Sequence, residues 1–209
     1  MSSTFHSIDL SKLSGSEIYK LMIGAIIPRP IAWVSTCGSS GVGNLAPFSF
    51  FNAVSSDPPC IMISVARKPN GEKKDTLKNI EETNTFVVNL VNEALVEVMN
   101  QTSADYPYGV DEMQKVGLTP APSLFCKASR VLESPIQLEC KLYRSLEIGE
   151  GKTAGSTTLI VGQILAMHVR DDVYDQGKIR PEVLKPIARL AGASYSKLGE
   201  IFEVARPKV

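Results

Sequence analysis

A run of 27 residues without a charged side chain, residues 30–56, constrains this chain more than any other feature. The run is too polar to span a membrane, and it holds too many Gly, Ser, Asn and Pro residues for an ordinary core segment. Its first part, Ile31–Thr36, is rich in β-branched and aromatic residues and predicts a strand. Three glycines within residues 38–43 predict a turn, so a second strand near Phe48–Val54 is expected to return as a hairpin.

Further strands and helices are expected along the rest of the chain. Stretches with strand-like composition predict strands over Cys60–Val65, Thr85–Val91, Ile136–Ile148 and Thr157–Val169. Ser14 and Glu17 have the spacing of a capping box and predict a short helix that ends at about Met22. Two more helices are expected, one that runs from an N-cap at Asp75 to about Glu82 and one over Glu93–Gln101.

Three regions carry more specific expectations. Residues 102–124 contain several prolines and glycines, which predict an extended excursion over the surface. In the strand Ile136–Ile148, apolar and polar residues alternate, which predicts that one face of the strand is exposed to water. The last part of the chain is expected to carry a loop or a helix near Pro181–Leu190.

The order of these elements predicts the fold class. About six strands have hairpin-length links, and the helices do not alternate with them, which argues against a doubly wound parallel sheet. The pattern favours a mainly β fold, a mostly antiparallel barrel with peripheral helices. Residues 1–209 show no internal repeat and no linker-like segment, so a single domain is expected.

The composition argues against several classes of function. Acidic and basic residues balance at 22 each, so no long-range field attracts nucleic acid or an anionic membrane. There is no apolar stretch of about 18 residues, and the N-terminus lacks the pattern of a signal peptide, so a cytoplasmic protein is expected. The four cysteines have no C-x-x-C spacing and are expected to be free thiols. Because the only histidines are His6 and His168, no metal site is expected.

A basic turn, residues 66–76, follows the uncharged run and carries four basic and two acidic side chains. A phosphate group binds to convergent cations together with hydroxyl and backbone N–H donors. Thr76 would offer both kinds of donor at a helix N-terminus, where the helix dipole also favours an anion. The neutral run and the basic turn together predict a ligand with a flat apolar body and a phosphate group. The alternative is a solvated loop whose lysines contact nothing.

Small polar side chains are set among apolar strand residues in the uncharged run and just after it. They are Ser35, Thr36, Asn44, Ser49, Asn52 and Ser64. Neutral donors and acceptors of this kind orient a heterocycle without the desolvation cost of a charge. Taken singly, each is also compatible with an ordinary turn or sheet residue.

Two positions in the last quarter of the chain are further candidates. His168 lies late in a predicted strand between apolar neighbours. It is either a partly buried structural histidine or a proton donor near a cofactor, because histidine side chains titrate near neutral pH. Tyr195 ends a cluster of polar, glycine and aromatic residues, residues 189–195, and it either packs against the protein or stacks on a ligand ring.

Five blocks of sequence follow one another in a specific order. They are Pro28–Thr36, Asn44–Asn52, Asp57–Pro59, Lys74–Ile80 and Phe86–Asn89. Together they resemble the flavin reductase-like family, in the branch that contains flavoredoxin. The resemblance is dense over about residues 25–92, and it returns more weakly at His168 and over residues 189–195.

The resemblance implies an FMN-binding split β-barrel, antiparallel and of Greek-key type, that works as a homodimer with the flavin near the subunit interface. The residues implied to line the flavin and its ribityl chain are Thr36, Asn44, Ala46, Pro47 and Ser49, with Asn52 close by. The residues implied to hold the phosphate are Ser64, Arg67, Lys74 and Thr76, with Asp75 orienting the turn. His168, as the catalytic candidate, and Tyr195 are implied to lie toward the isoalloxazine ring, within one subunit or across the dimer.

The resemblance also implies an activity, that of an oxidoreductase in which NAD(P)H delivers hydride to bound FMN. The electron acceptor is then free flavin, another small molecule or a redox protein. The sequence has no signature of its own for NAD(P)H, so two other hypotheses stay open. One is an FMN electron carrier that is loaded by a partner protein, and the other is a flavin-binding module without a redox role.

Overall fold

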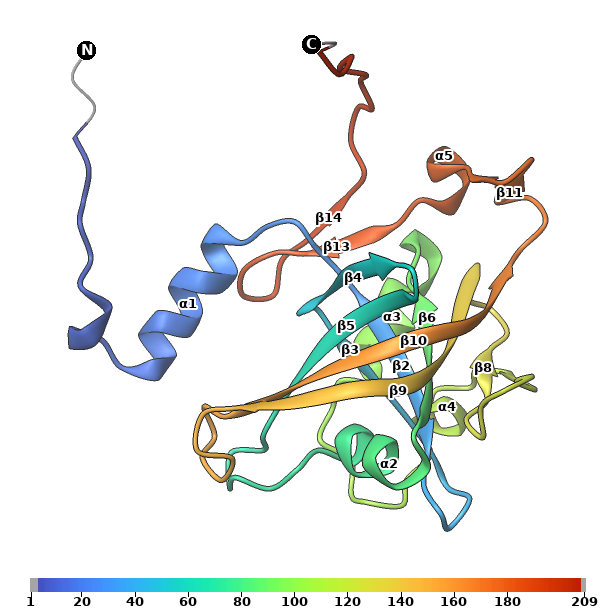
Figure 1. Ribbon diagram of the computed structural model, residues 1–209, viewed down its shortest axis with the longest axis horizontal. Coiled ribbons are helices and arrows are strands. Elements are labelled where there is room, and N and C mark those ends of the chain that lie inside the picture. Colours follow the sequence, from blue (N-terminus) through green and yellow to red (C-terminus); the bar gives the residue numbers. More distant parts are fainter. Residues whose placement is uncertain (1–3, 208–209) are drawn as a thin grey trace.

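The computed structural model describes residues 4–207, so residues 1–3 and 208–209 of the expected single domain lie outside the described residues. Seven strands form an antiparallel sheet in the order β3-β2-β6-β9-β10-β5-β4 (Figure 1). These strands are β2 (Ala32–Cys37), β3 (Gly43–Phe48), β4 (Phe51–Ser56), β5 (Pro59–Ala66), β6 (Thr85–Leu90), β9 (Ile136–Ile148) and β10 (Thr157–Val169).

Short elements surround this sheet. The helices are α1 (Gly15–Ala25), α2 (Asp75–Thr83), α3 (Val96–Gln101), α4 (Glu112–Lys115) and α5 (Pro181–Leu184), with 3-10 turns η1 (Leu10–Lys12) and η2 (Glu93–Leu95). The short strands are β1 (Arg29–Pro30), β7 (Pro120–Ala121), β8 (Arg130–Val131), β11 (Tyr174–Asp175), β12 (Lys178–Ile179), β13 (Ile187–Arg189) and β14 (Tyr195–Lys197). Among residues 4–207, no helix is long and apolar enough to cross a membrane.

The connection between β3 and β4 curls the sheet into a barrel. These strands occupy opposite edges of the sheet, yet only Ser49 and Phe50 separate them in the chain. Three Cα-to-Cα steps span at most about 11 Å, so the two edges must approach one another. The backbone N–H of Ser64 on β5 donates to the carbonyl of Phe50 at 2.9 Å, which fixes this connection. The expected mainly β, antiparallel barrel with peripheral helices is confirmed.

Apolar side chains from the central strands fill the barrel, and Val34, Ile63 and Phe86 are fully buried there. Helix α2 closes one end of the barrel because Leu77 and Ile80, three positions apart, lie on the same helix face and join this core. The predicted helix boundaries are nearly correct. Asp75 is, however, the first residue of α2, and Lys74 takes the N-cap position without a side-chain cap.

After the glycine turn, the uncharged run forms two strands, β3 and β4, where the sequence predicted one. The glycine turn leads directly into β3, whose Asn44 pairs with Thr36 and whose Phe48 pairs with Ala32 on β2. The prediction of a single strand over Phe48–Val54 is therefore wrong. The chain bends after Phe48 because β3 and β4 belong to opposite edges of the sheet.

The polar face of β9 is covered over its first half, so the prediction of an exposed face is wrong there. Gln137 is 5% exposed and Glu139 is 0% exposed. Residues 119–134 cover this face, and their backbone groups bond to both side chains. Tyr143, farther along β9, is exposed as the alternation predicts. The expected excursion over 102–124 also contains α4, whose Met113 packs in a second core cluster.

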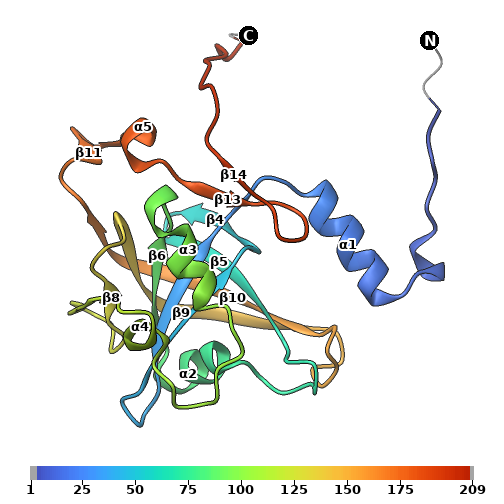
Figure 2. The same ribbon diagram turned by 180° about the vertical axis from the view of Figure 1, so that it is seen from behind.

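Helix α1 begins with the predicted capping box. The backbone N–H of Ser14 donates to Glu17 at 2.8 Å, and the Ser14 hydroxyl accepts from the Glu17 backbone at 3.4 Å. The helix continues to Ala25, three residues past the predicted end. Figures 1 and 2 both show α1 beside the barrel rather than packed across it, and Ile23 is its buried residue. Most of the apolar surface of this helix is consequently exposed.

Candidate functional site

A cavity of about 410 Å³ lies between β3, the N-terminus of α2 and the segment that follows α3. Six residues implied by the family resemblance line it: Asn44, Ala46, Pro47, Lys74, Asp75 and Thr76. The volume falls in the range of small-molecule and cofactor sites, which is roughly 300–1,000 Å³. We call this space the main cavity.

Neutral side chains join β2, β3 and α2 at the wall of the main cavity. The Asn44 side-chain amide donates to the hydroxyl of Thr76 at 3.0 Å and to that of Thr36 at 3.3 Å. The Asn79 amide donates to the same Thr36 hydroxyl at 3.0 Å. Thr36 and Thr76 are both 1% exposed, so these bonds satisfy buried polar groups without any charge. Thr36, Asn44 and Thr76 are thus brought together, although Thr36 does not line the main cavity.

The lysines of the basic turn differ in whether an acidic partner neutralises them. Lys68 lies 3.3 Å from Asp75, and Lys78 lies 3.4 Å from the same carboxylate. Lys73 pairs with Glu81 at 2.7 Å. Lys74 forms no ion pair with any residue between 4 and 207, and its ammonium lies 6.0 Å from the centre of the Phe48 ring. An ammonium at the N-terminus of α2, without an acidic partner, therefore faces the main cavity.

The first turn of α2 adds further attraction for an anion. Backbone N–H groups in the first turn of a helix have no acceptor within the helix, and the helix dipole is positive at this end. Thr76 lies in this turn and lines the cavity. Asp75 holds Lys68 and Lys78 through its ion pairs, so it orders the turn on both sides. The donors here match the chemistry of a phosphate group.

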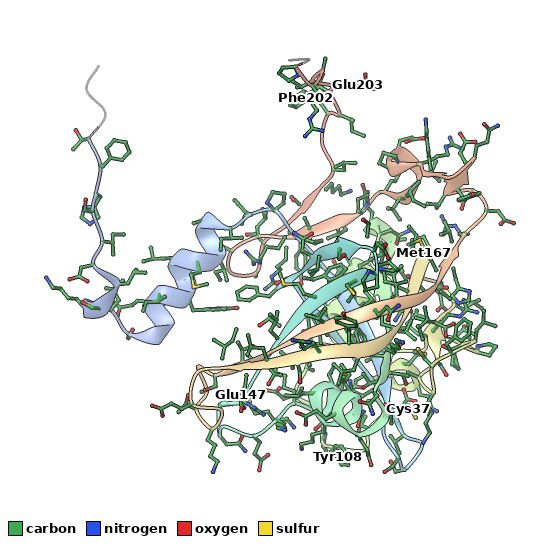
Figure 3. The ribbon with its side chains drawn as sticks, in the orientation of Figure 1. Cys37, Tyr108, Glu147, Met167, Phe202 and Glu203 are labelled. Atoms are coloured by element: carbon green, nitrogen blue, oxygen red, sulfur yellow. The ribbon has the colours of Figure 1, made fainter. Side chains whose placement is uncertain are left out.

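Two residues implied to hold the phosphate lie elsewhere. Arg67 is 5% exposed and pairs with Glu147 at the end of β9, the residue labelled beside the β9–β10 hairpin in Figure 3. The Ser64 hydroxyl lies 2.8 Å from the Thr157 hydroxyl on β10. Neither Ser64 nor Arg67 lines the main cavity. In this arrangement the basic groups at the main cavity are Lys68 and Lys74.

A second cavity of about 200 Å³ adjoins the main cavity and shares Pro47, Phe48 and Ser103 with it. Ser49, implied to line the flavin and its ribityl chain, and Tyr195, implied to lie toward the ring, line this second cavity. Asn52 lies apart from both cavities on the exposed strand β4, and its side-chain oxygen accepts from the Ala53 backbone at 2.8 Å. The structure thus brings Ser49 and Tyr195 together at the second cavity, but neither Asn52 nor His168 lines it.

His168 is held by a buried carboxylate outside both cavities. Its Nε2 atom lies 2.7 Å from Glu139, which also accepts backbone N–H groups from Leu124 at 2.8 Å and Phe125 at 2.6 Å. Burial by itself would raise the pKa of Glu139, but these N–H groups and His168 outweigh it and hold the pKa below the usual value. His168 therefore helps to fix the segment that covers β9.

Several cavity residues carried no signal in the sequence. Residues 102–106 line the main cavity from the segment after α3, where the sequence showed only a surface excursion. Glu112 of α4 also lines it and accepts the backbone N–H of Leu45 at 2.8 Å. Burial raises the pKa of Glu112, while the Leu45 N–H opposes this change. Because the contact between α4 and β3 joins distant parts of the chain, only the tertiary structure reveals it.

The comparisons with known proteins identify the family. A family model described as a flavin reductase like domain matches residues 23–183. The chain therefore belongs to the flavin reductase-like family, as its sequence blocks indicated, and this family places it among the flavin-related oxidoreductases. The expected split β-barrel fold is confirmed as well.

Three solved structures illustrate the similarity. The nitrilotriacetate monooxygenase component B of Bacillus cereus is 41% identical with a TM-score of 0.93, covering 97% of this chain and 100% of that chain. The 2-nitrobenzoate 2-nitroreductase of Pseudomonas fluorescens is 33% identical with a TM-score of 0.86, covering 97% and 96%. Flavoredoxin of Desulfovibrio vulgaris is 23% identical with a TM-score of 0.72, covering 86% and 92%, and this likeness shows the fold alone.

The bonds that Glu139 accepts from His168, Leu124 and Phe125 predict that the free energy of unfolding decreases at acidic pH. A carboxylate with a lowered folded-state pKa stabilises the protein above its unfolded pKa, about 4.3, and this contribution disappears as pH falls through the lower folded value. Glu139→Gln should lower the free energy of unfolding by about 1–3 kcal/mol at pH 6. Urea unfolding should show this difference narrowing as the pH falls below about 4.3, the unfolded pKa.

The matched control is Glu97→Gln, since Glu97 is exposed on α3. This variant should differ from the wild type by less than about 0.5 kcal/mol throughout the same pH range. A Glu139→Gln difference that stays constant down to pH 3.5 would contradict the assigned role of the Glu139 carboxylate.

Proposed function

We propose that the chain binds FMN in the main cavity and catalyses NAD(P)H-dependent reduction of a flavin or a related acceptor. The observation that carries the proposal is the ammonium of Lys74, which has no acidic partner among the described residues and stands beside Thr76 at the N-terminus of α2. A phosphate monoester supplies the missing negative charge there. One phosphate, rather than the diphosphate of FAD, fits a turn in which Asp75 already engages Lys68 and Lys78.

The residues between the phosphate end and the second cavity would orient the rest of the cofactor. Asn44, Ala46 and Pro47 lie along β3 and offer a neutral wall to the ribityl chain and the ring. A strand rises about 3.3 Å per residue, so β3 runs about 13 Å from Asn44 to Phe48. This wall suits an extended ligand with its phosphate at Lys74 and its ring toward Pro47.

Bound FMN would supply the redox chemistry by accepting hydride from NAD(P)H and passing electrons on. The chain would bind the phosphate, set the position of the ring and limit the access of water. Residues 102–106 lie along the main cavity and would cover the bound cofactor. Monooxygenase and nitroreductase relatives at 41% and 33% identity support an oxidoreductase that donates electrons to a small molecule or a partner protein.

We also propose that the protein works as a homodimer. Strand β4 is exposed over residues 52–56, including Val54, and Leu146 and Ile148 are exposed on β9 of the same sheet. In Figure 1 no helix crosses in front of β4, β5, β10 and β9, whereas Figure 2 shows α3 and α4 in front of the sheet. A second copy would cover this face, and His168, which lines neither cavity, would approach a flavin ring across such an interface.

Reduction under anaerobic conditions tests the proposed activity most directly. The purified, FMN-loaded protein should lose its visible flavin absorbance when NADH or NADPH is added. If neither nucleotide bleaches a flavin that dithionite does reduce, the reductase proposal fails and the electron-carrier hypothesis leads. Colourless protein that takes up no added FMN would instead favour the module without a redox role.

Substitution in the basic turn tests the phosphate site. Lys74→Ala should weaken FMN binding by about 1–3 kcal/mol, the range for hydrogen bonds that involve a charged group. Lys73→Ala is the matched control because its neighbouring ammonium is already paired with Glu81. Fluorescence titration of the cofactor-free variants measures both affinities. If the two variants bind FMN with equal affinity, the phosphate does not bind at Lys74.

Sedimentation velocity tests the homodimer. The wild-type protein should sediment at twice the chain mass of 22.7 kDa. Val54→Glu should shift it toward the monomer, because the substitution buries a charge in the proposed interface. Leu132→Glu, at an equally exposed leucine outside this sheet face, should stay dimeric. A monomeric wild type, or a Val54→Glu variant as dimeric as the wild type, contradicts the proposed interface.

A further inference from the structure

The second cavity has its own set of ligand-binding groups. Tyr19 from α1, Asn100 from α3, and Arg189 and Tyr195 from the C-terminal strands line it, and its other lining residues are Ile31, Pro47, Phe48, Ser49, Met99 and Ser103. It meets the main cavity at the end of β3, where the ring of the cofactor is proposed to lie. A ligand in the second cavity would therefore be adjacent to that ring.

Arg189 is the cationic group of this cavity, and it is held in place without a carboxylate. Its guanidinium carbon lies 4.5 Å from the centre of the Tyr195 ring, and one N–H group donates to the carbonyl of Gly192. The Tyr195 hydroxyl donates to the side-chain oxygen of Asn100 at 3.2 Å, which fixes the ring. Within residues 4–207 Arg189 has no acidic partner, so most of its five N–H donors remain free for a ligand.

The chemistry of the lining selects one class of ligand. A guanidinium held in a fixed plane suits the two oxygens of a carboxylate, which it binds with two parallel hydrogen bonds. The rings of Tyr19 and Tyr195, together with Met99, offer apolar contact to an aromatic ring. About 200 Å³ is below the range of drug-sized ligands, so the cavity suits a one-ring compound rather than a whole dinucleotide.

We propose that the second cavity binds a small aromatic carboxylate, with its carboxylate on Arg189 and its ring between Tyr19 and Tyr195. The proposal rests on the proposed FMN site, because the bound compound lies next to a flavin ring only if FMN occupies the main cavity. Arg189 then acts as the residue that selects an anionic second reactant. Binding itself depends only on residues of the second cavity, and it can be measured apart from turnover.

Isothermal titration calorimetry of the FMN-loaded protein with benzoate tests the proposal, with benzamide as a neutral ligand of nearly the same shape. Benzoate should bind at least about ten-fold more tightly than benzamide. Arg189→Gln should weaken benzoate by about 10- to 100-fold, and Arg189→Lys should lie between this variant and the wild type. Arg180→Gln removes the same charge from an exposed pair with Glu182 and should leave benzoate affinity unchanged.

Several results would overturn the site. Benzamide binding as tightly as benzoate, or unchanged benzoate binding by a folded Arg189→Gln variant with a wild-type circular dichroism spectrum, removes the role of Arg189. If Arg189→Gln does not fold, Arg189→Lys with undiminished benzoate affinity has the same meaning. If inorganic phosphate competes as strongly as benzoate, the site does not select an aromatic ligand. If the protein takes up no FMN, the proposed function fails, yet Arg189-dependent benzoate binding by the cofactor-free protein still supports this anion site.

Discussion

The neutral contact between β3 and the N-terminus of α2 is the constraint on which the candidate site depends. One amide, that of Asn44, reaches the hydroxyls of both Thr36 and Thr76, so hydrogen bonds between neutral groups fix the N-terminus of the helix against the strand. Strands β2 and β3 carry no charged side chain, and Lys74 forms no ion pair with any residue between 4 and 207. The Thr36 and Thr76 hydroxyls accept from neutral amides, and the cation at the helix N-terminus stays available to a ligand.

The two cavities lie at opposite ends of the proposed flavin site. The main cavity begins at the basic turn, and the second cavity begins where β3 ends, so a phosphate and a second reactant approach the proposed ring position from opposite ends. Helix α1 contributes Tyr19 to the second cavity although it stands beside the barrel. Figure 3 shows Phe202 and Glu203 on a C-terminal segment that also extends away from the barrel. Apolar surface on these projecting segments agrees with the proposal that a second copy completes the molecule.

The sequence predicted the parts of the site that depend on local chemistry. The strand Ile31–Thr36 and the helix after Asp75 follow from patterns within single segments, and the grouping of Asn44 with Thr76 agrees with the family resemblance. The glycine turn was predicted, but the division of the following segment into β3 and β4 was not. That division depends on the closure of the whole sheet, which no local pattern encodes.

Residues whose partners are distant in sequence could not be placed in this way. Arg67 pairs with Glu147 because the register of β5 against β10, and of β10 against β9, brings them together. Glu139 looked like one member of an exposed alternation, yet it is buried by the segment whose N–H groups it accepts. Glu112 and residues 102–106 reach the main cavity only after α4 packs against β3. In each case tertiary pairing decides the role of the side chain.

The central claim is that the basic turn binds the phosphate of a mononucleotide, and the comparison of FMN with riboflavin tests it most directly. Riboflavin has the same ring and ribityl chain but lacks the phosphate. Titration of the cofactor-free protein should show FMN binding at least about ten-fold more tightly than riboflavin, as expected when a charge-assisted contact is lost. Riboflavin that binds as tightly as FMN would contradict the account, because Lys74 and the N-terminus of α2 would then hold no phosphate.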